Sequence, residues 1–199
     1  MRVGVLVSGQ GTNLQSLIDA EAAGALGPAT LAVAISNKPG VPALDRAAKA
    51  KLAAVVVPHA GVSRETFEDQ LVAALASHRV ELVVLAGFMR VLTARFVDRY
   101  PLAIINTHPS LLPAFPGIDA AAQAIAYGAK VTGVTIHFVD ASLDGGPIIA
   151  QESVPVLETD DPAALQARIQ QVEHRLLPDV VRRLAAGQLA CEGRRVRAK

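Results

Sequence analysis

Asn106 and His108 are the residues whose types and spacing best suit catalysis, and they lie in the run Asn106–Pro113. An amide and an imidazole separated by one residue on an extended chain point to the same side. The amide can donate a hydrogen bond to a developing oxyanion, and the imidazole can donate a hydrogen bond or move a proton. The pair therefore predicts acyl-group transfer, with a satisfied loop histidine as the alternative.

Two carboxylates, Asp140 and Asp144, lie further along the chain in a loop between two apolar runs. Either could orient and charge His108 through a hydrogen bond, which would raise the pKa of the imidazole. The alternative is turn chemistry, because Asp144-Gly145-Gly146-Pro147 is itself a turn signal. The sequence is consistent both with a carboxylate that charges His108 and with aspartates that only form the turn.

A glycine-rich turn, Ser8–Asn13, follows the first apolar run and opens a helical segment. Free backbone N–H groups and the helix dipole at such a turn can hold a phosphate group. A dinucleotide fingerprint needs a glycine where Leu14 stands and an acid near Ser36–Lys38, so NAD is not expected. Lys38 on an NADP 2′-phosphate and a plain tight turn are the remaining alternatives.

Neither metal catalysis nor a covalent intermediate is expected. The histidines show no close ligand pair and no helical i, i+4 spacing, so no metal site is predicted. Cys191 lies near the C-terminus, and neither Ser8 nor Ser110 lies in a G-x-S-x-G context. Direct attack by an amine of the substrate is therefore the simpler mechanism.

An alternation of apolar runs and helical segments must position these groups. The runs predict buried parallel strands at Val3–Val7, Leu31–Ile35, Ala54–Val57, Leu82–Leu85 and Ala103–Ile105. The segments between them predict helices at Asn13–Ala23, Pro42–Lys51, Arg64–Ser77 and Thr93–Arg99. This is a doubly wound α/β pattern, whose ligands bind at the carboxyl edge of the sheet.

The pattern changes after Asn106. Val131–Val139, a loop and Ile148–Val156 predict antiparallel strands, giving a mostly parallel sheet of about seven strands with an antiparallel C-terminal part. Asp160-Asp161-Pro162 then predicts the start of a long helix across the sheet, with Leu165, Ile169, Val172 and Leu176 on its apolar face. We expect a single domain over 1–199, with lobes of roughly 1–100 and 101–199.

The amino-acid composition indicates which partners and which cell compartment to expect for the protein. Nineteen basic and eighteen acidic residues leave a net charge of +1, which offers no broad footprint for nucleic acid or an anionic membrane. One cysteine and the lack of a signal peptide or membrane span predict a cytoplasmic protein. The basic run Arg194–Lys199 is expected to be a solvated tail.

Four motifs together resemble the phosphoribosylglycinamide formyltransferase family: Ser8–Gln15, Leu85–Leu92, Asn106–Pro113 and Asp144–Pro147. The resemblance spans nearly the whole chain and implies a Rossmann-like formyltransferase fold. It also implies formyl transfer from 10-formyltetrahydrofolate, the co-substrate, to glycinamide ribonucleotide in de novo purine synthesis. The implied partners are these small molecules, and neither nucleic acid nor a membrane is expected. The implied oligomeric state is a monomer or a homodimer.

The resemblance assigns roles by position. It implies a catalytic trio of Asn106, His108 and Asp144, in which His108 is the proton donor and Asp144 raises its pKa. The implied ribonucleotide-binding residues are Gly11, Thr12, Asn13, Gln170, Gln171, Val172 and Glu173. The implied folate-binding residues are Arg64, Met89, Arg90, Val91, Leu92, Asn106, Asp140, Ala141, Ser142, Leu143 and Asp144.

Some alternatives remain beside this assignment. Glu173 could be a solvated glutamate beside an apolar stripe, and Met89, Val91 and Leu92 could be core residues. Gln10 and Asp119 depart from the family pattern, and Asp119 is given no role. The rival activities are formyl transfer to methionyl-tRNA or an amino sugar, hydrolysis of formyltetrahydrofolate, and a non-enzymatic nucleotide-binding module.

Overall fold

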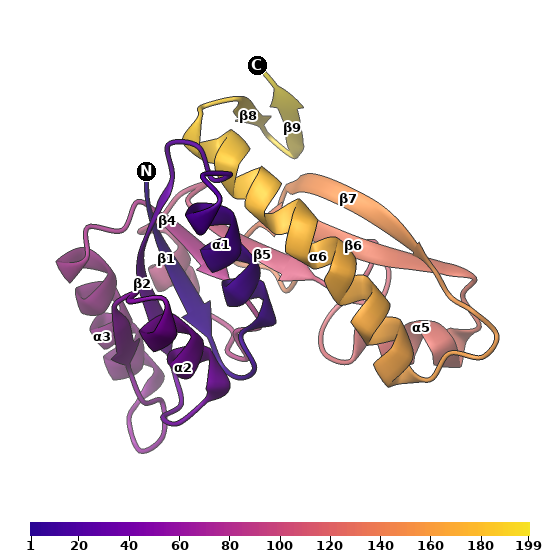
Figure 1. Cartoon of the computed structure of the whole chain (residues 1–199), viewed down its shortest axis with the longest axis horizontal. Helices are drawn as coiled ribbons and strands as arrows, with labels where there is room; N and C mark the ends of the chain where they lie inside the picture. Colours follow the sequence, from indigo (N-terminus) through magenta and orange to yellow (C-terminus); the bar gives the residue numbers. More distant parts are fainter.

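The computed structural model describes residues 1–199 and contains one mixed sheet of nine strands, in the order β3-β2-β1-β4-β5-β6-β7-β9-β8 (Figure 1). The strands are β1 (Arg2–Val7), β2 (Thr30–Ser36), β3 (Ala54–Val56), β4 (Leu82–Leu85), β5 (Ile104–His108), β6 (Val131–Phe138), β7 (Ile148–Pro155), β8 (Leu189–Glu192) and β9 (Arg195–Ala198). The helices are α1 (Thr12–Ala22), α2 (Pro42–Lys49), α3 (Arg64–Ser77), α4 (Ala94–Val97), α5 (Ala120–Tyr127) and α6 (Pro162–Ala185).

Strand pairing confirms the predicted fold class. β1 to β5 pair in parallel, and β6 pairs antiparallel with both β5 and β7. The apolar residues of α1, α2, α5 and α6 join one buried cluster, whereas those of α3 and α4 join a second. Figure 1 shows α6 running beside α1 and across β6. Helices therefore cover both faces, as a doubly wound sheet requires.

The sheet is larger than predicted, because the chain end forms a hairpin rather than a solvated tail. β8 and β9 pair antiparallel, and Arg195 of β9 also pairs with Ile148 of β7. Val196 packs against the core while Arg195 and Arg197 are exposed. Polar and apolar residues thus alternate along an outer strand, a pattern hidden by the number of arginines.

Most predicted bounds differ from the observed ones by one or two residues, and the total difference is largest at β5 and α4. β5 extends to His108 because β6 continues the ladder, pairing Asn106 with His137 and His108 with Thr135. The helix expected at Thr93–Arg99 is only Ala94–Val97. Thr93 is its N-cap, and beyond Val97 the backbone nitrogens of Arg99 and Tyr100 bond to carbonyls three residues back, as in a 3₁₀ turn, rather than four.

The turn between β1 and α1 requires a glycine at position 11. Gly11 has a φ of 71°, and a Cβ there would lie 2.6 Å from Cβ of Ala43 at the start of α2. Only a glycine can adopt this conformation and leave room for α2. The turn is therefore held in a fixed place against two helices.

Candidate active site

The centre of the site is the end of β5, where Asn106 and His108 occupy alternate positions along the strand. The intervening Thr107 is buried and donates a hydrogen bond to Glu173 of α6. His137 on β6 lies opposite Asn106 in the antiparallel ladder. The ladder thus brings His137, which no sequence motif marks as a site residue, next to the predicted catalytic amide.

His137 is held as a hydrogen-bond acceptor for Asn106. Its Nδ1 lies 2.8 Å from the carbonyl oxygen of Phe138, so this nitrogen must carry the proton. Burial, the largest influence, lowers the pKa of His137, and the neutral ring keeps a lone pair on Nε2. The amide nitrogen of Asn106 lies 3.2 Å from that Nε2 and donates one of its two hydrogens to it. The other hydrogen of the amide is left for a substrate.

His108 has a different neighbour on each ring nitrogen. Its Nε2 lies 2.9 Å from the carbonyl oxygen of Phe115, which requires a proton on Nε2. Its Nδ1 lies 3.5 Å from Oδ2 of Asp144, with the imidazole almost fully buried. The backbone contact therefore assigns the proton of a neutral ring to Nε2 and leaves Nδ1 as the nitrogen that faces the carboxylate.

Asp144 rather than Asp140 faces the histidines. Its Oδ1 is 3.9 Å from Nε2 of His137, and its Oδ2 accepts a 2.7 Å hydrogen bond from the backbone of Gly117. Asp140 instead accepts hydrogen bonds from the backbone and hydroxyl of Ser142. Asp140 thus stabilises the turn of the loop, whereas Asp144 lies beside the two imidazoles.

The loop that carries Asp144 is tightly packed. A Cβ at Gly146 would lie 1.8 Å from the carbonyl oxygen of Phe138, closer than any real contact. Asp144 itself has a φ of 50°, in the left-handed region that side chains seldom adopt. The packing of the loop against β6 sets where the carboxylate lies.

The predicted ribonucleotide residues come together only in part. Asn13 of α1 donates a 3.0 Å hydrogen bond to Oε2 of Glu173, and Thr107 donates a 3.3 Å hydrogen bond to its Oε1. Glu173 is 4% exposed, so the solvated alternative is wrong. Burial raises the pKa of this carboxyl. Of its neighbours, Val172 packs in the core, Gln170 is half-buried and Gln171 is exposed.

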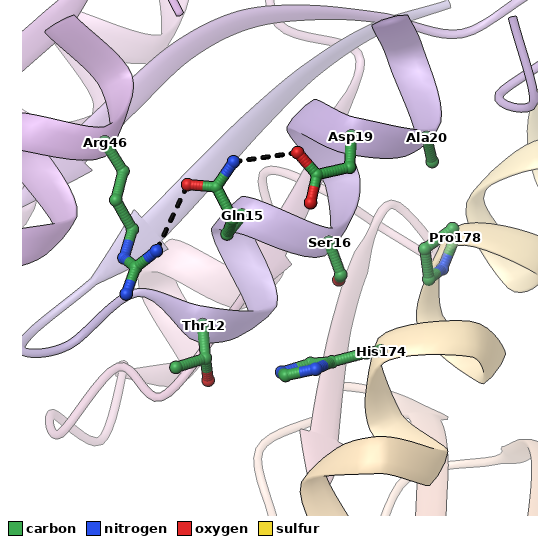
Figure 2. Close-up of a pocket in the computed structure, with 8 residues that line it drawn as sticks. All are labelled: Thr12, Gln15, Ser16, Asp19, Ala20, Arg46, His174 and Pro178. Carbon is green, nitrogen blue, oxygen red and sulfur yellow. Dashed lines mark hydrogen bonds between the residues drawn. The ribbon is translucent and has the colours of Figure 1, made fainter. Parts of the chain in front are cut away.

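Beside the glycine-rich turn lies a cavity of about 430 Å³ between α1, α2 and α6 (Figure 2). Its lining residues are Thr12, Gln15, Ser16, Asp19, Ala20, Arg46, His174 and Pro178. The guanidinium of Arg46 donates to the carbonyl oxygen of Gln10 and to Oε1 of Gln15. Sequence reasoning missed Arg46, for which the sequence gives no local signal.

His174 also faces this cavity (Figure 2). Its Nε2 is buried without a hydrogen-bond partner. Burial and then the charge of Arg46 lower the pKa of this histidine. His174 follows directly after the predicted ribonucleotide segment, which ends at Glu173.

Most of the predicted folate residues lie in loop segments with exposed side chains. Met89 and Val91 are 64% and 59% exposed, so they are not core residues, whereas Leu92 is buried. Ala141, Ser142 and Leu143 are exposed in the loop before Asp144. Arg64 is exposed in the first turn of α3. Exposed apolar side chains at a sheet edge are suited to a flat aromatic ligand.

A doubly wound sheet with an amide, an imidazole and a carboxylate at its carboxyl edge has the features of an α/β group-transfer enzyme. A model of the formyl transferase family matches residues 1–181, and the chain belongs to this family. No group of three or more histidine, cysteine or acidic side chains is arranged to hold a metal ion. None of the helices has the length and hydropathy needed to span a bilayer.

Similar proteins carry more specific names. The chain is 45% identical over 202 residues to phosphoribosylglycinamide formyltransferase of Mycobacterium tuberculosis H37Rv, covering 98% of this chain and 93% of that one. It is 46% identical over 188 residues to the trifunctional purine biosynthetic protein adenosine-3 of Drosophila melanogaster. That match covers 94% of this chain but only 14% of the fly protein.

The crystal structure of glycinamide ribonucleotide transformylase 1 from Symbiobacterium toebii is also similar. Its TM-score is 0.97 with 46% sequence identity, and the match covers 100% of this chain and 93% of that one. The chain therefore resembles the two sequence relatives over at least 94% of its length and the transformylase structure over its whole length.

Proposed function

We propose that the protein transfers a formyl group from 10-formyltetrahydrofolate to the amine of 5′-phosphoribosylglycinamide. The products are the N-formyl ribonucleotide and tetrahydrofolate, in de novo purine (IMP) synthesis. The convergence of Asn106, His108 and Asp144 carries the proposal, in a chain whose relatives are named for this reaction. We also propose a cytoplasmic location, in keeping with a single free cysteine.

The site residues suggest how the reaction proceeds. The neutral amine attacks the formyl carbon, a carbon–nitrogen bond forms, and the carbonyl oxygen becomes an oxyanion. The free hydrogen of the Asn106 amide and a proton on Nδ1 of His108 stabilise that oxyanion. The carboxylate of Asp144, 3.5 Å from Nδ1, would pair with the imidazolium during this step. The bond to the folate nitrogen then breaks as this nitrogen takes the proton that the amine loses.

Two regions would hold the substrates. The phosphate of the ribonucleotide would lie at the N-terminus of α1, on the backbone of Gly11, Thr12 and Asn13. Arg46 lines the adjoining cavity and would add positive charge, and His174, which also lines it, would offer the ring nitrogen Nε2 that has no partner within the chain. The folate would lie along residues 89–92 and 140–144, beside Asn106 and Arg64.

The test is an absorbance assay with 10-formyl-5,8-dideazafolate, run with and without the ribonucleotide. We expect deformylation that depends on the ribonucleotide and that falls by about 10²–10³ in Asn106→Ala or His108→Ala, as for loss of an oxyanion donor. His78→Ala is the control, because His78 lies beside Arg2, at the start of β1 and far from the carboxyl edge. Turnover without any amine would instead identify a hydrolase, and no turnover in either condition would reject the proposal.

A further inference from the structure

The backbone of residues 87–92 takes part in no backbone-to-backbone hydrogen bond, although it follows β4 almost directly. Ala86 still donates to Leu6, and the next such bond along the chain is accepted by Thr93. A segment without ladder or helix bonds depends on side chains for its conformation. This segment contains the four residues, 89–92, that the proposed function places against the folate.

Two buried side chains from other elements hold the two ends of the segment. At one end, Oγ of Ser8 accepts a 2.9 Å hydrogen bond from the backbone nitrogen of Met89. At the other end, Oε1 of Glu68 accepts a 2.8 Å hydrogen bond from the backbone nitrogen of Thr93. Oε2 of Glu68 accepts a second hydrogen bond, from the hydroxyl of Thr93. Both ends are thus fixed, while the N–H and C=O groups between them stay free.

Glu68 is an unusual residue to find in this place. It is 3% exposed, lies among the apolar residues of α3, and forms an ion pair with no basic side chain. Burying a carboxylate without a cation costs stability that an apolar residue of similar shape would not. The contacts with Thr93 are the only hydrogen bonds of its carboxylate, so the effect of burying this charge is to fix the position of Thr93.

The fixed position of Thr93 also determines where its neighbours Phe96 and Leu92 lie. Its hydroxyl donates to Glu68 and accepts a 3.4 Å hydrogen bond from the backbone of Phe96, so Thr93 caps α4 in one orientation. Leu92, just before it, is buried in the same cluster as Phe96. A displaced Thr93 would therefore shift Leu92 and the exposed Val91 with it.

We infer that Glu68 is a positioning residue for folate binding: it fixes the end of segment 89–92 so that its free backbone groups and apolar side chains meet the folate. The inference rests on the proposed function. Glu68 lies one helical turn after Arg64, on the same side of α3. The same helix thus carries an exposed base in its first turn and, one turn later, the buried carboxylate that holds Thr93.

The experiment compares Glu68→Leu, Glu68→Gln and the control Glu65→Gln. Binding of 10-formyl-5,8-dideazafolate is measured by fluorescence titration, and turnover by steady-state kinetics. Glu68→Leu removes both acceptors, and Glu68→Gln keeps two polar contacts without the charge. We expect Glu68→Leu to raise the Kd and KM for the folate at least about tenfold, since a misplaced segment loses its contacts with the ligand. The KM for the ribonucleotide and kcat at saturation should change little. Glu68→Gln should restore most of the affinity.

Glu65→Gln is the matched control, because Glu65 is exposed on the same helix and makes no hydrogen bond through its side chain. If Glu68→Leu does not fold, Glu68→Asp gives the same test, because it draws the carboxylate away from Thr93.

A Glu68→Leu protein that binds folate like the wild type would overturn the inference, and so would a Glu68→Gln protein as defective as Glu68→Leu. Equal losses for both substrates would show a merely structural role. A wild type that binds no folate overturns the proposed function as well.

Discussion

The side-chain nitrogen of Asn106 donates to Nε2 of His137 across the β5–β6 ladder, over 3.2 Å. The backbone carbonyl of Phe138 fixes the proton on the other nitrogen of that ring. A buried, neutral histidine therefore sets which way the amide of Asn106 points. Without this acceptor the amide is free to turn its oxygen toward the place where negative charge develops.

Replacing His137 should impair the chemical step more than binding. We expect His137→Leu to lower kcat by roughly tenfold with little change in either KM, because a rotated amide no longer donates to the oxyanion. Steady-state kinetics with each substrate varied in turn measures this, with His78→Leu as the control. Unchanged kcat in His137→Leu would show that the contact does not orient Asn106.

The two aspartates of the β6–β7 loop should respond very differently to loss of charge. Asp144→Asn should lower kcat by about 10², since an amide cannot stabilise the charged imidazole of His108 as a carboxylate does. Asp140→Asn should keep most turnover, because an amide oxygen can still accept from Ser142. Parallel assays of the two variants check this, and equal losses would contradict the distinction between them.

Sequence reasoning recovered most of the fold because its signals are local. Buried parallel strands read as unbroken apolar runs, as Leu82–Leu85 does, and α3 has the predicted bounds Arg64–Ser77 with Ser63 as its cap. The hairpin of β8 and β9 was missed, because its pairing with β7 is a tertiary contact that a basic run conceals.

The site was predictable only where a motif marks it. Asn106, His108 and Asp144 lie in recognisable runs, and the structure brings them together. His137 reaches Asn106 through the antiparallel register and Glu68 reaches Thr93 through the packing of α3, and neither contact leaves a local pattern in the sequence. Arg46 likewise reaches the glycine-rich turn only because α2 packs beside α1.

Arg46 should matter for the ribonucleotide and not for the folate. Arg46→Ala removes the guanidinium beside the turn and should raise the KM for the ribonucleotide by about tenfold, as for a lost charge-assisted contact with a phosphate. Lys49→Ala is the control, because Lys49 is an exposed base in the last turn of the same helix. Competition by inorganic phosphate should weaken in Arg46→Ala alone. A ribonucleotide KM equal to that of the wild type would place the phosphate elsewhere.

Glu173 should lower the stability of the protein at neutral pH. Burial raises the pKa of this carboxyl above its ordinary value of 4.5, despite opposing hydrogen bonds from Asn13 and Thr107 and the nearby His108. A raised pKa means that its contribution to stability is fully present below the ordinary value and is lost as the pH rises through the raised one. A glutamine, which has no charge to bury, should avoid that loss.

We therefore expect Glu173→Gln to have a higher Tm than the wild type at about pH 7, with an advantage that shrinks as the pH falls toward 4.5. The amide also offers a donor to Oδ1 of Asn13, which is buried without a partner. Thermal melts over this pH range measure the difference, with the exposed Glu158→Gln as the control. The KM for the ribonucleotide should rise in the same variant, because an amide oxygen accepts less strongly than a carboxylate from Asn13, which lies at the proposed phosphate turn. A variant less stable than the wild type at pH 7 would mean that the ionised carboxylate holds α1, β5 and α6 together.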